Sequence, residues 1–258
     1  MHIKANNVRK LVLKMIHNAK SGHIGGSFSM ADIISVLYSN FNLTDGKNDK
    51  LILSKGHAVP AIYAALVLAG VVEEKELETF RQVDSRLQGH PDKCRLSNVV
   101  ATTGSLGQGI SIAIGHALAN KLSNKKDNVF CIVGDGEMQE GQIWESIMLA
   151  PSLNLNNFYL IVDKNGAQND GEVDKILSLD TGATLVKKIE SFGWEVFEID
   201  GHNEDEILSC FNKRLNKPVA IVANTVKGKG VSFMETYEWH AKAPNDEEYK
   251  KAIMELES

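Results

Sequence analysis

NVFCIVGDG, residues 128–136, joins an apolar run to a turn that carries a carboxylate. The apolar run predicts a strand buried on both faces, the kind found in parallel sheets. Asp135 follows that strand directly and has a glycine on each side, which lets a ligand approach the backbone closely. A second apolar run, residues 157–164, follows after a helix-length interval and ends on Asn165.

Neighbouring parallel strands place their last residues side by side at one edge of the sheet. Asp135 and Asn165 would then face a common point with a carboxylate and an amide oxygen. Mg²⁺ prefers such oxygen ligands and commonly shares them with phosphates. The competing interpretation is two ordinary strand ends, because Gly, Asp and Asn all favour turns. The GDG turn, the helix-length interval and the second strand ending in Asn together favour a metal–diphosphate site.

A length of 258 residues fits one large domain or two small ones, and we take the chain as a single domain over residues 1–258. The net charge of −5 comes from mixed acids and bases without a basic stripe, so we expect no nucleic-acid partner. The three cysteines, Cys94, Cys131 and Cys210, form no CxxC pair and predict neither a disulfide framework nor a zinc site. No signal-like or membrane-length apolar run occurs, which leads us to expect a cytoplasmic protein without membrane contact.

Predicted strands alternate with predicted helices along the chain. Strands are expected at 51–53, 129–133, 158–162, 194–199 and 219–225, and helices at 2–18, 30–40, 58–70, 73–83, 107–122, 139–150, 181–192 and 203–214. A loop and a short acidic helix are expected in 226–258. The alternation predicts an α/β fold, a doubly wound and mainly parallel sheet with helices on both faces. Ligands of such sheets bind outside the carboxyl ends of the strands.

Four histidines stand in loop-type sequence and suggest a shared pocket. They are His23 in SGHIGGS, His57 in LSKGHA, His90 in QGHPD and His240 in EWHAKAP. Imidazole suits phosphate contact and proton transfer near neutral pH. For any one of them, a local hydrogen bond in its loop is an equally simple account. His202, in IDGHN, is interpreted as a turn or cap residue.

Two further signals carry competing interpretations. TGSLGQG, residues 103–109, could be a nicotinamide-cofactor loop, because a glycine-rich turn that opens a helix can bind phosphate. It follows a polar loop instead of a first long strand, and no acidic residue closes a second strand about 20 residues later, so this interpretation is weak. Glu140, five residues past Asp135, is a candidate active-site carboxylate, with a plain surface position as the alternative.

Together these motifs resemble the transketolase family of thiamine-diphosphate enzymes. The resemblance extends over almost the whole chain in the order SGHIGG, LSKGHA, FRQ, GHP, TTGSLGQGI, GDGEMQEG, DKNG, IDGH and WHAKAP. It covers only the N-terminal, diphosphate-binding domain of that family, and so implies its thiamine-diphosphate-binding fold. The pyrimidine-binding and C-terminal domains of single-chain transketolases have no counterpart here.

The resemblance implies roles for individual positions. Asp135, Asn165 and the backbone carbonyl of Ala167 would hold Mg²⁺, for which Ca²⁺ or Mn²⁺ could substitute. Gly136, His57 and His240 would hold the diphosphate of thiamine diphosphate, and Gly104, Ser105 and Leu106 its aminopyrimidine. His23 and His90 would face the reacting carbon, and Glu140 would join a carboxylate cluster across a subunit interface. Histidines 23, 57, 90 and 240 and Glu140 are therefore the expected catalytic set.

Two sequence features depart from the family pattern. Ser105 replaces the usual proline, and HIGGSFS at 23–29 replaces the commoner HPGAPMG, as in split and deoxyxylulose-phosphate-synthase-like relatives. In the family, a glutamate that activates the cofactor and arginines that bind sugar phosphate come from the pyrimidine-binding and C-terminal regions. The resemblance therefore implies the N-terminal subunit of a two-chain transketolase, active only with a C-terminal partner subunit in an α2β2 assembly.

The implied reaction transfers a two-carbon ketol unit from a ketose phosphate to an aldose, as in the pentose phosphate pathway. One alternative is a split relative that acts on an unusual sugar, branched, sulfonated or from secondary metabolism. Another is the alpha subunit of a 2-oxo-acid dehydrogenase, although that family lacks the LSKGHA and GHP histidines. A non-catalytic binding protein that kept the fold is a third, and it has no need of four loop imidazoles.

Overall fold

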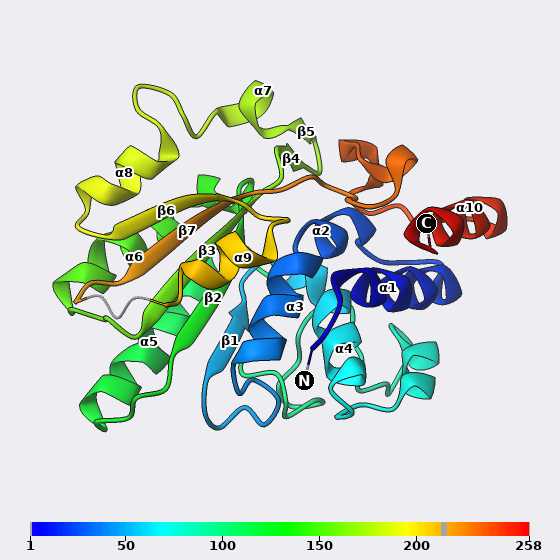
Figure 1. Cartoon of the computed structure of the whole chain (residues 1–258), viewed down its shortest axis with the longest axis horizontal. Helices are drawn as coiled ribbons and strands as arrows, with labels where there is room; N and C mark the ends of the chain where they lie inside the picture. The colour runs from blue at the N-terminus through cyan, green and yellow to red at the C-terminus, as the bar shows by residue number, and fades with distance from the viewer. Residues whose placement is uncertain (1, 213–215, 258) are drawn as a thin grey trace.

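The computed structural model describes residues 2–212 and 216–257. Five strands form one sheet in which every neighbouring pair is parallel (Figure 1). Their spatial order is β1 (Lys50–Leu53), β2 (Val129–Gly134), β3 (Phe158–Lys164), β7 (Val219–Asn224) and β6 (Glu195–Asp200). The three central strands are almost entirely buried, as their continuous apolar runs predict.

Helices cover both faces of the sheet, and each face has its own hydrophobic core. Successive residues of a strand point to opposite faces, so Phe130 and Ile132 join one core while Cys131 and Val133 join the other. The first core is shared with α1 (Ala5–Ala19), α2 (Ile24–Ser29), α3 (Ala31–Asn40), α4 (Val59–Leu68), α9 (Glu204–Ser209) and α10 (Asp246–Glu257). The second is shared with α5 (Gln108–Leu122), α6 (Gly141–Ser152), α7 (Val173–Leu177) and α8 (Leu185–Ser191). The predicted doubly wound α/β fold is confirmed.

The register of β2 and β3 brings the two predicted strand ends together. Gly134 pairs with Asp163, and the backbone N–H of Asp135 donates to the Asp163 carbonyl at 3.3 Å. The next residues along both strands therefore leave the sheet side by side. The expectation that these strands are parallel neighbours is correct.

Several segments differ from the sequence prediction. SGHIGGS, expected to be a turn, contains the start of helix α2, whose six residues are all buried. Burial outweighs the poor helix propensity of its glycines. Residues 73–83, expected to be a helix, form only a short 3₁₀ stretch, Glu74–Thr79, behind a capping box made by Glu73 and Glu76. A small hairpin of β4 (Ala167–Gln168) and β5 (Gly171–Glu172) was not expected.

The helix predicted at 203–214 is shorter in the structure. Helix α9 spans Glu204–Ser209, and Asn203 caps it by accepting from the N–H groups of Asp205 and Glu206. Residues 213 and 214 of that prediction lie outside the described residues. Within the described ranges, we find no helix with the length and apolar character needed to span a bilayer.

Candidate active site

A cavity of about 430 Å³ opens where β2 and β3 end. The turn after β2, the hairpin after β3 and the loop after β7 all contribute to its lining. Four predicted loop histidines line it as well, together with Asp135, Gly136, Asn165 and Ala167. The cavity therefore sits at the carboxyl edge of the parallel sheet, the place where such sheets bind ligands.

Asp135 is only 2% exposed, and backbone donors hold its carboxylate. One oxygen accepts from the N–H of Gly136 at 2.8 Å and the other from the N–H of Gly166 at 2.6 Å. Burial, and next the charge of Asp163, raise the pKa of Asp135 to about 6. A carboxylate has about four acceptor positions, so both oxygens keep capacity for a further partner.

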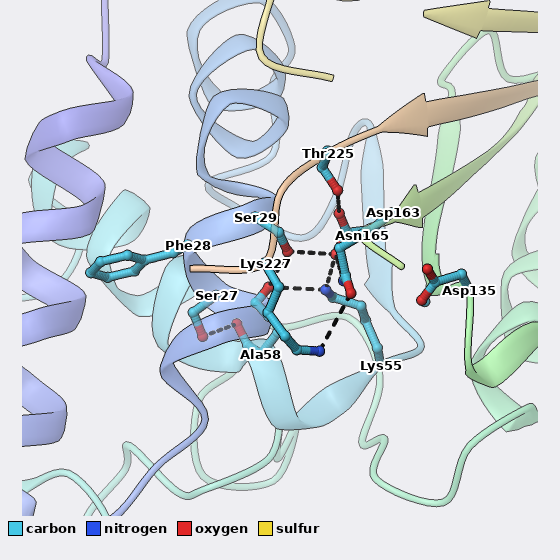
Figure 2. Close-up of polar contacts among 12 residues, drawn as sticks. Ser27, Phe28, Ser29, Lys55, Ala58, Asp135, Asp163, Asn165, Thr225 and Lys227 are labelled. Carbon is cyan, nitrogen blue, oxygen red and sulfur yellow. Dashed lines mark hydrogen bonds and ion pairs between the residues drawn. The ribbon is translucent and has the colours of Figure 1, made fainter. Parts of the chain in front are cut away.

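The amide of Asn165 has a fixed orientation. Its Nδ2 donates to Asp163 at 2.9 Å, and its Oδ1 accepts from the N–H of Ala167 at 3.2 Å. The ammonium of Lys227 donates to the Ala167 carbonyl at 2.6 Å and lies 3.4 Å from Asn165 Oδ1. Figure 2 shows Asn165 between Lys227 and Asp135 in that view.

These donors suit a hard divalent cation. Asp135, Asn165 and the Ala167 carbonyl offer oxygen, as Mg²⁺, Mn²⁺ and Ca²⁺ require. Within the described residues, no group of three or more His, Cys, Asp or Glu side chains is arranged to bind a metal. A metal at this edge of the sheet would therefore depend on the amide and backbone oxygens.

The four histidines expected to share a pocket do converge. The ring centroids of His23 and His57 are 5.1 Å apart, and those of His23 and His240 are 5.5 Å apart. His57 and His240 are 5.1 Å apart, whereas His90 is 6.4 Å from His23. The Nδ1 of His240 is buried without a hydrogen-bond partner in the described part of the chain. The ring of His240 lines the cavity, where a diphosphate oxygen would suit an imidazole donor.

Burial keeps the four imidazoles uncharged at neutral pH. Desolvation, and next the charge of Arg81, lower the pKa of His23 to about 4. Desolvation, and next the charge of Lys227, lower the pKa of His240 to about 3. The pKa values of His57 and His90 are lowered as well, with burial the largest cause in both. Each ring is therefore a neutral donor and acceptor, suited to orient hydroxyl or phosphate oxygens.

Glu137 fixes the loop that precedes α5. It is buried, and it accepts from the N–H of Gly107 at 2.9 Å and from the N–H of Gly134 at 3.1 Å. Gly104 and Leu106 line the cavity, whereas Ser105 is exposed and is not among the lining residues. Glu140 lines the cavity but is exposed at its rim. The chemical roles expected for Gly104, Ser105, Leu106 and Glu140 stay predictions.

Besides Glu137, three other charged residues of this site were not expected from the sequence. Lys55 is 1% exposed and forms a buried ion pair with Asp163, which is fully buried. Asp163 also accepts from the hydroxyls of Ser29 and Thr225. The third of these residues is Lys227, which lines the cavity. The rule that strand ends carry function could have found Asp163 on β3 and Lys227 just after β7.

We expect Lys55→Met to lower the free energy of unfolding by about 3–5 kcal/mol, because it leaves the Asp163 carboxylate buried without its counter-charge. The double variant Lys55→Met/Asp163→Asn should cost less than the two single changes added together. Arg86→Met is the matched control: its pair with Glu76 is half exposed, and such a pair contributes at most about 1 kcal/mol. Urea unfolding measures all the variants, and equal losses for Lys55→Met and Arg86→Met would contradict this account.

The sequence as a whole matches a known domain. Residues 2–256 match the family model described as "Transketolase, thiamine diphosphate binding domain". The chain belongs to the transketolase family. This agrees with the five-stranded parallel sheet, the acidic turn after β2 and the histidine-lined cavity.

Relatives of this transketolase-family chain fall into two groups by length. It is 40% identical to the 6-deoxy-6-sulfo-D-fructose transketolase subunit SqwG of Clostridium sp. (strain MSTE9), over 98% of this chain and 95% of the relative. It is 37% identical to an apulose-4-phosphate transketolase subunit of Actinobacillus succinogenes, over 96% of this chain and 92% of the relative. The crystal structure of transketolase from Campylobacter jejuni superposes with a TM-score of 0.90 at 33% identity, covering 98% of this chain and 42% of the other. The chain thus spans less than half the length of that single-chain transketolase.

Proposed function

We propose that this chain is the diphosphate-binding subunit of a split transketolase, a transferase that needs a partner subunit. The observation that carries the proposal is the similarity to relatives that are named as transketolase subunits. The alignment covers nearly all of a named transketolase subunit, but only 42% of a single-chain transketolase of the same fold. By analogy with these named subunits, we propose that a second polypeptide supplies the pyrimidine-binding and C-terminal domains, in an α2β2 assembly.

The surface beside the cavity supports a partner on this side. Glu140 is exposed at the cavity rim, on the turn that leads into α6. Helices α5 and α6 expose Ile112 at 38%, Met148 at 59% and Leu149 at 46%. Exposed apolar side chains on neighbouring helices can form part of an interface. We propose that the partner covers these helices and closes the cavity.

In the proposed site, Asp135, Asn165 and the Ala167 carbonyl hold a divalent cation, and Gly136, His57 and His240 hold the diphosphate of thiamine diphosphate. Gly104, Ser105 and Leu106 lie along its aminopyrimidine. Bound there, the cofactor supplies the nucleophilic carbon for ketol transfer. His23 and His90, neutral at physiological pH, donate hydrogen bonds to the oxygens of the donor and acceptor sugars. Glu140 meets the partner's carboxylates.

The sugar proposed here is an unusual one. By their names, the related transketolase subunits belong to enzymes that act on 6-deoxy-6-sulfo-D-fructose and on apulose 4-phosphate. This favours a ketose of this kind over the ordinary pentose phosphate substrates. The transketolase match gives no support to a 2-oxo-acid dehydrogenase role. The donor we propose is a ketose with a terminal sulfonate or phosphate, from which a two-carbon ketol unit passes to an aldose.

A sugar panel tests this assignment. The chain and the partner from its neighbouring reading frame are combined with thiamine diphosphate and Mg²⁺ and given 6-deoxy-6-sulfofructose, apulose 4-phosphate, fructose 6-phosphate or xylulose 5-phosphate. We expect kcat/KM for one of the first two to exceed both others by at least about tenfold, since polar sites discriminate strongly between substrates. A preference for fructose 6-phosphate or xylulose 5-phosphate would restore the pentose phosphate interpretation.

A further inference from the structure

Lys227 lines the cavity from the loop after β7, and Gly25 leaves room for its side chain. A Cβ on Gly25 would lie 2.7 Å from the Lys227 Cγ, so the lysine stem runs directly over this position. Gly228 has a φ of +75°, and its Cβ would lie 2.0 Å from the carbonyl oxygen of Met234. Gly228 also donates its N–H to the Gly25 carbonyl at 3.1 Å. The backbone on both sides of the lysine stem is therefore fixed.

The same loop is anchored on its other side by His202. The N–H of Val226 donates to His202 Nε2 at 2.9 Å, and His202 Nδ1 lies 2.7 Å from Asp32 Oδ2. Asp32 in turn pairs with the buried Arg9. His202 thus does more than close a turn, the role expected from the sequence. Lys227 itself is only 4% exposed, so its ammonium is largely shielded from bulk water.

The ammonium contacts two of the three oxygens assigned to the metal. Lys227 Nζ is 2.6 Å from the Ala167 carbonyl oxygen and 3.4 Å from Asn165 Oδ1. Figure 2 shows the lysine reaching toward Asn165, on the opposite side from Asp135 in that view. Lys55 lies nearby but is committed to Asp163 and to the Gly26 carbonyl. Among the described residues, Lys227 is thus the cation seen to engage the metal-facing oxygens.

A divalent ion bound by these oxygens would stand about 2.0–2.6 Å from each of them. An ammonium on the same two oxygens would then lie within a few ångströms of that ion, in a buried setting where like charges repel strongly. We propose that Lys227 is a tethered cation that competes with the divalent ion for Asn165 Oδ1 and the Ala167 carbonyl. Metal binding then requires the ammonium to leave these oxygens. This inference rests on the metal site of the proposed function.

A purely structural role for Lys227 makes the opposite prediction. If the lysine served only to tie the loop after β7 to the β4–β5 hairpin, its removal would loosen Ala167 and weaken metal binding. Competition predicts tighter binding when the charge is removed. The sign of the change in metal affinity therefore separates the two roles.

The experiment measures Mn²⁺ binding to the full chain in the absence of thiamine diphosphate, by electron paramagnetic resonance of free Mn²⁺. Lys227→Met removes the charge, and Lys227→Gln removes it while keeping a donor for the Ala167 carbonyl. Lys229→Met is the matched control, because it loses the same charge two residues away and does not line the cavity. Asp135→Ala in each background identifies the binding that belongs to this site.

We expect Lys227→Met and Lys227→Gln to bind Mn²⁺ at least about tenfold more tightly than the unmodified chain, given the strength of buried charge repulsion, and Lys229→Met to leave the affinity unchanged. Unchanged or weaker Asp135-dependent binding in both Lys227 variants would overturn the competition while leaving the metal site in place. Mn²⁺ binding that does not depend on Asp135 in any variant would overturn the metal site and the inference together.

Discussion

Asp135→Ala should weaken Mg²⁺-dependent binding of thiamine diphosphate at least about 10- to 100-fold, the loss seen when even an outer partner of a metal ligand is removed. The carboxylate is the only charged group among the three oxygens assigned to the metal. It is buried, and two backbone N–H groups hold it at the carboxyl edge of the sheet. A substitution at this position therefore removes the one negative charge that faces the assigned metal.

The raised pKa of Asp135 helps to separate a lost ligand from a lost fold. Burial and the neighbouring Asp163 charge both disfavour the carboxylate, so its removal relieves an unfavourable charge and the variant should stay folded. Asp135→Asn keeps the shape and one neutral oxygen, and should bind with intermediate affinity. Asp205→Ala, an exposed acid at the start of α9, is the charge-matched control. Titration calorimetry with Mg²⁺ present checks all three, and unchanged affinity in Asp135→Ala would remove the metal assignment.

The sheet and its functional edge were predictable because they depend on local patterns. Continuous apolar runs predicted the strands, and the helix-length interval between Asp135 and Asn165 predicted that two of them are parallel neighbours. Loop-type sequence around His23, His57 and His240 predicted rings at one cavity, and their centroids lie 5.1–5.5 Å apart. In each case a short-range rule coincided with the tertiary arrangement.

The features that the sequence did not predict depend on contacts between segments that are distant along the chain. Helix α2 forms in a glycine-rich stretch because it is buried among α1, α3 and α4. Helix propensity depends on the local sequence and does not include such burial. Asp163 sits inside an apolar strand, and only the fold reveals that Lys55, Ser29 and Thr225 converge on it. Lys227 reaches Ala167 across 60 residues of sequence. Such pairings carry no local signature, although the strand-end rule applied to β7 would have drawn attention to Lys227.

The second large effect concerns turnover by the chain alone. In the proposed assignment this chain holds the cofactor's diphosphate end, while the group that activates the cofactor belongs to the partner. The histidines that line the cavity do not replace it, because burial keeps them neutral and lowers the pKa of His23 to about 4. A protein of this kind should bind cofactor without performing ketol transfer.

Ketol transfer by the purified chain, measured with and without its partner subunit, therefore tests the central claim most directly. Saturating thiamine diphosphate and Mg²⁺ are present in both samples, and the sugar is the one preferred in the panel described above. We predict no turnover above background for the chain alone or for the partner alone, and activity when the two are mixed. Asp135→Ala in the mixture should remove that activity. Full activity from the chain alone would contradict the two-subunit account.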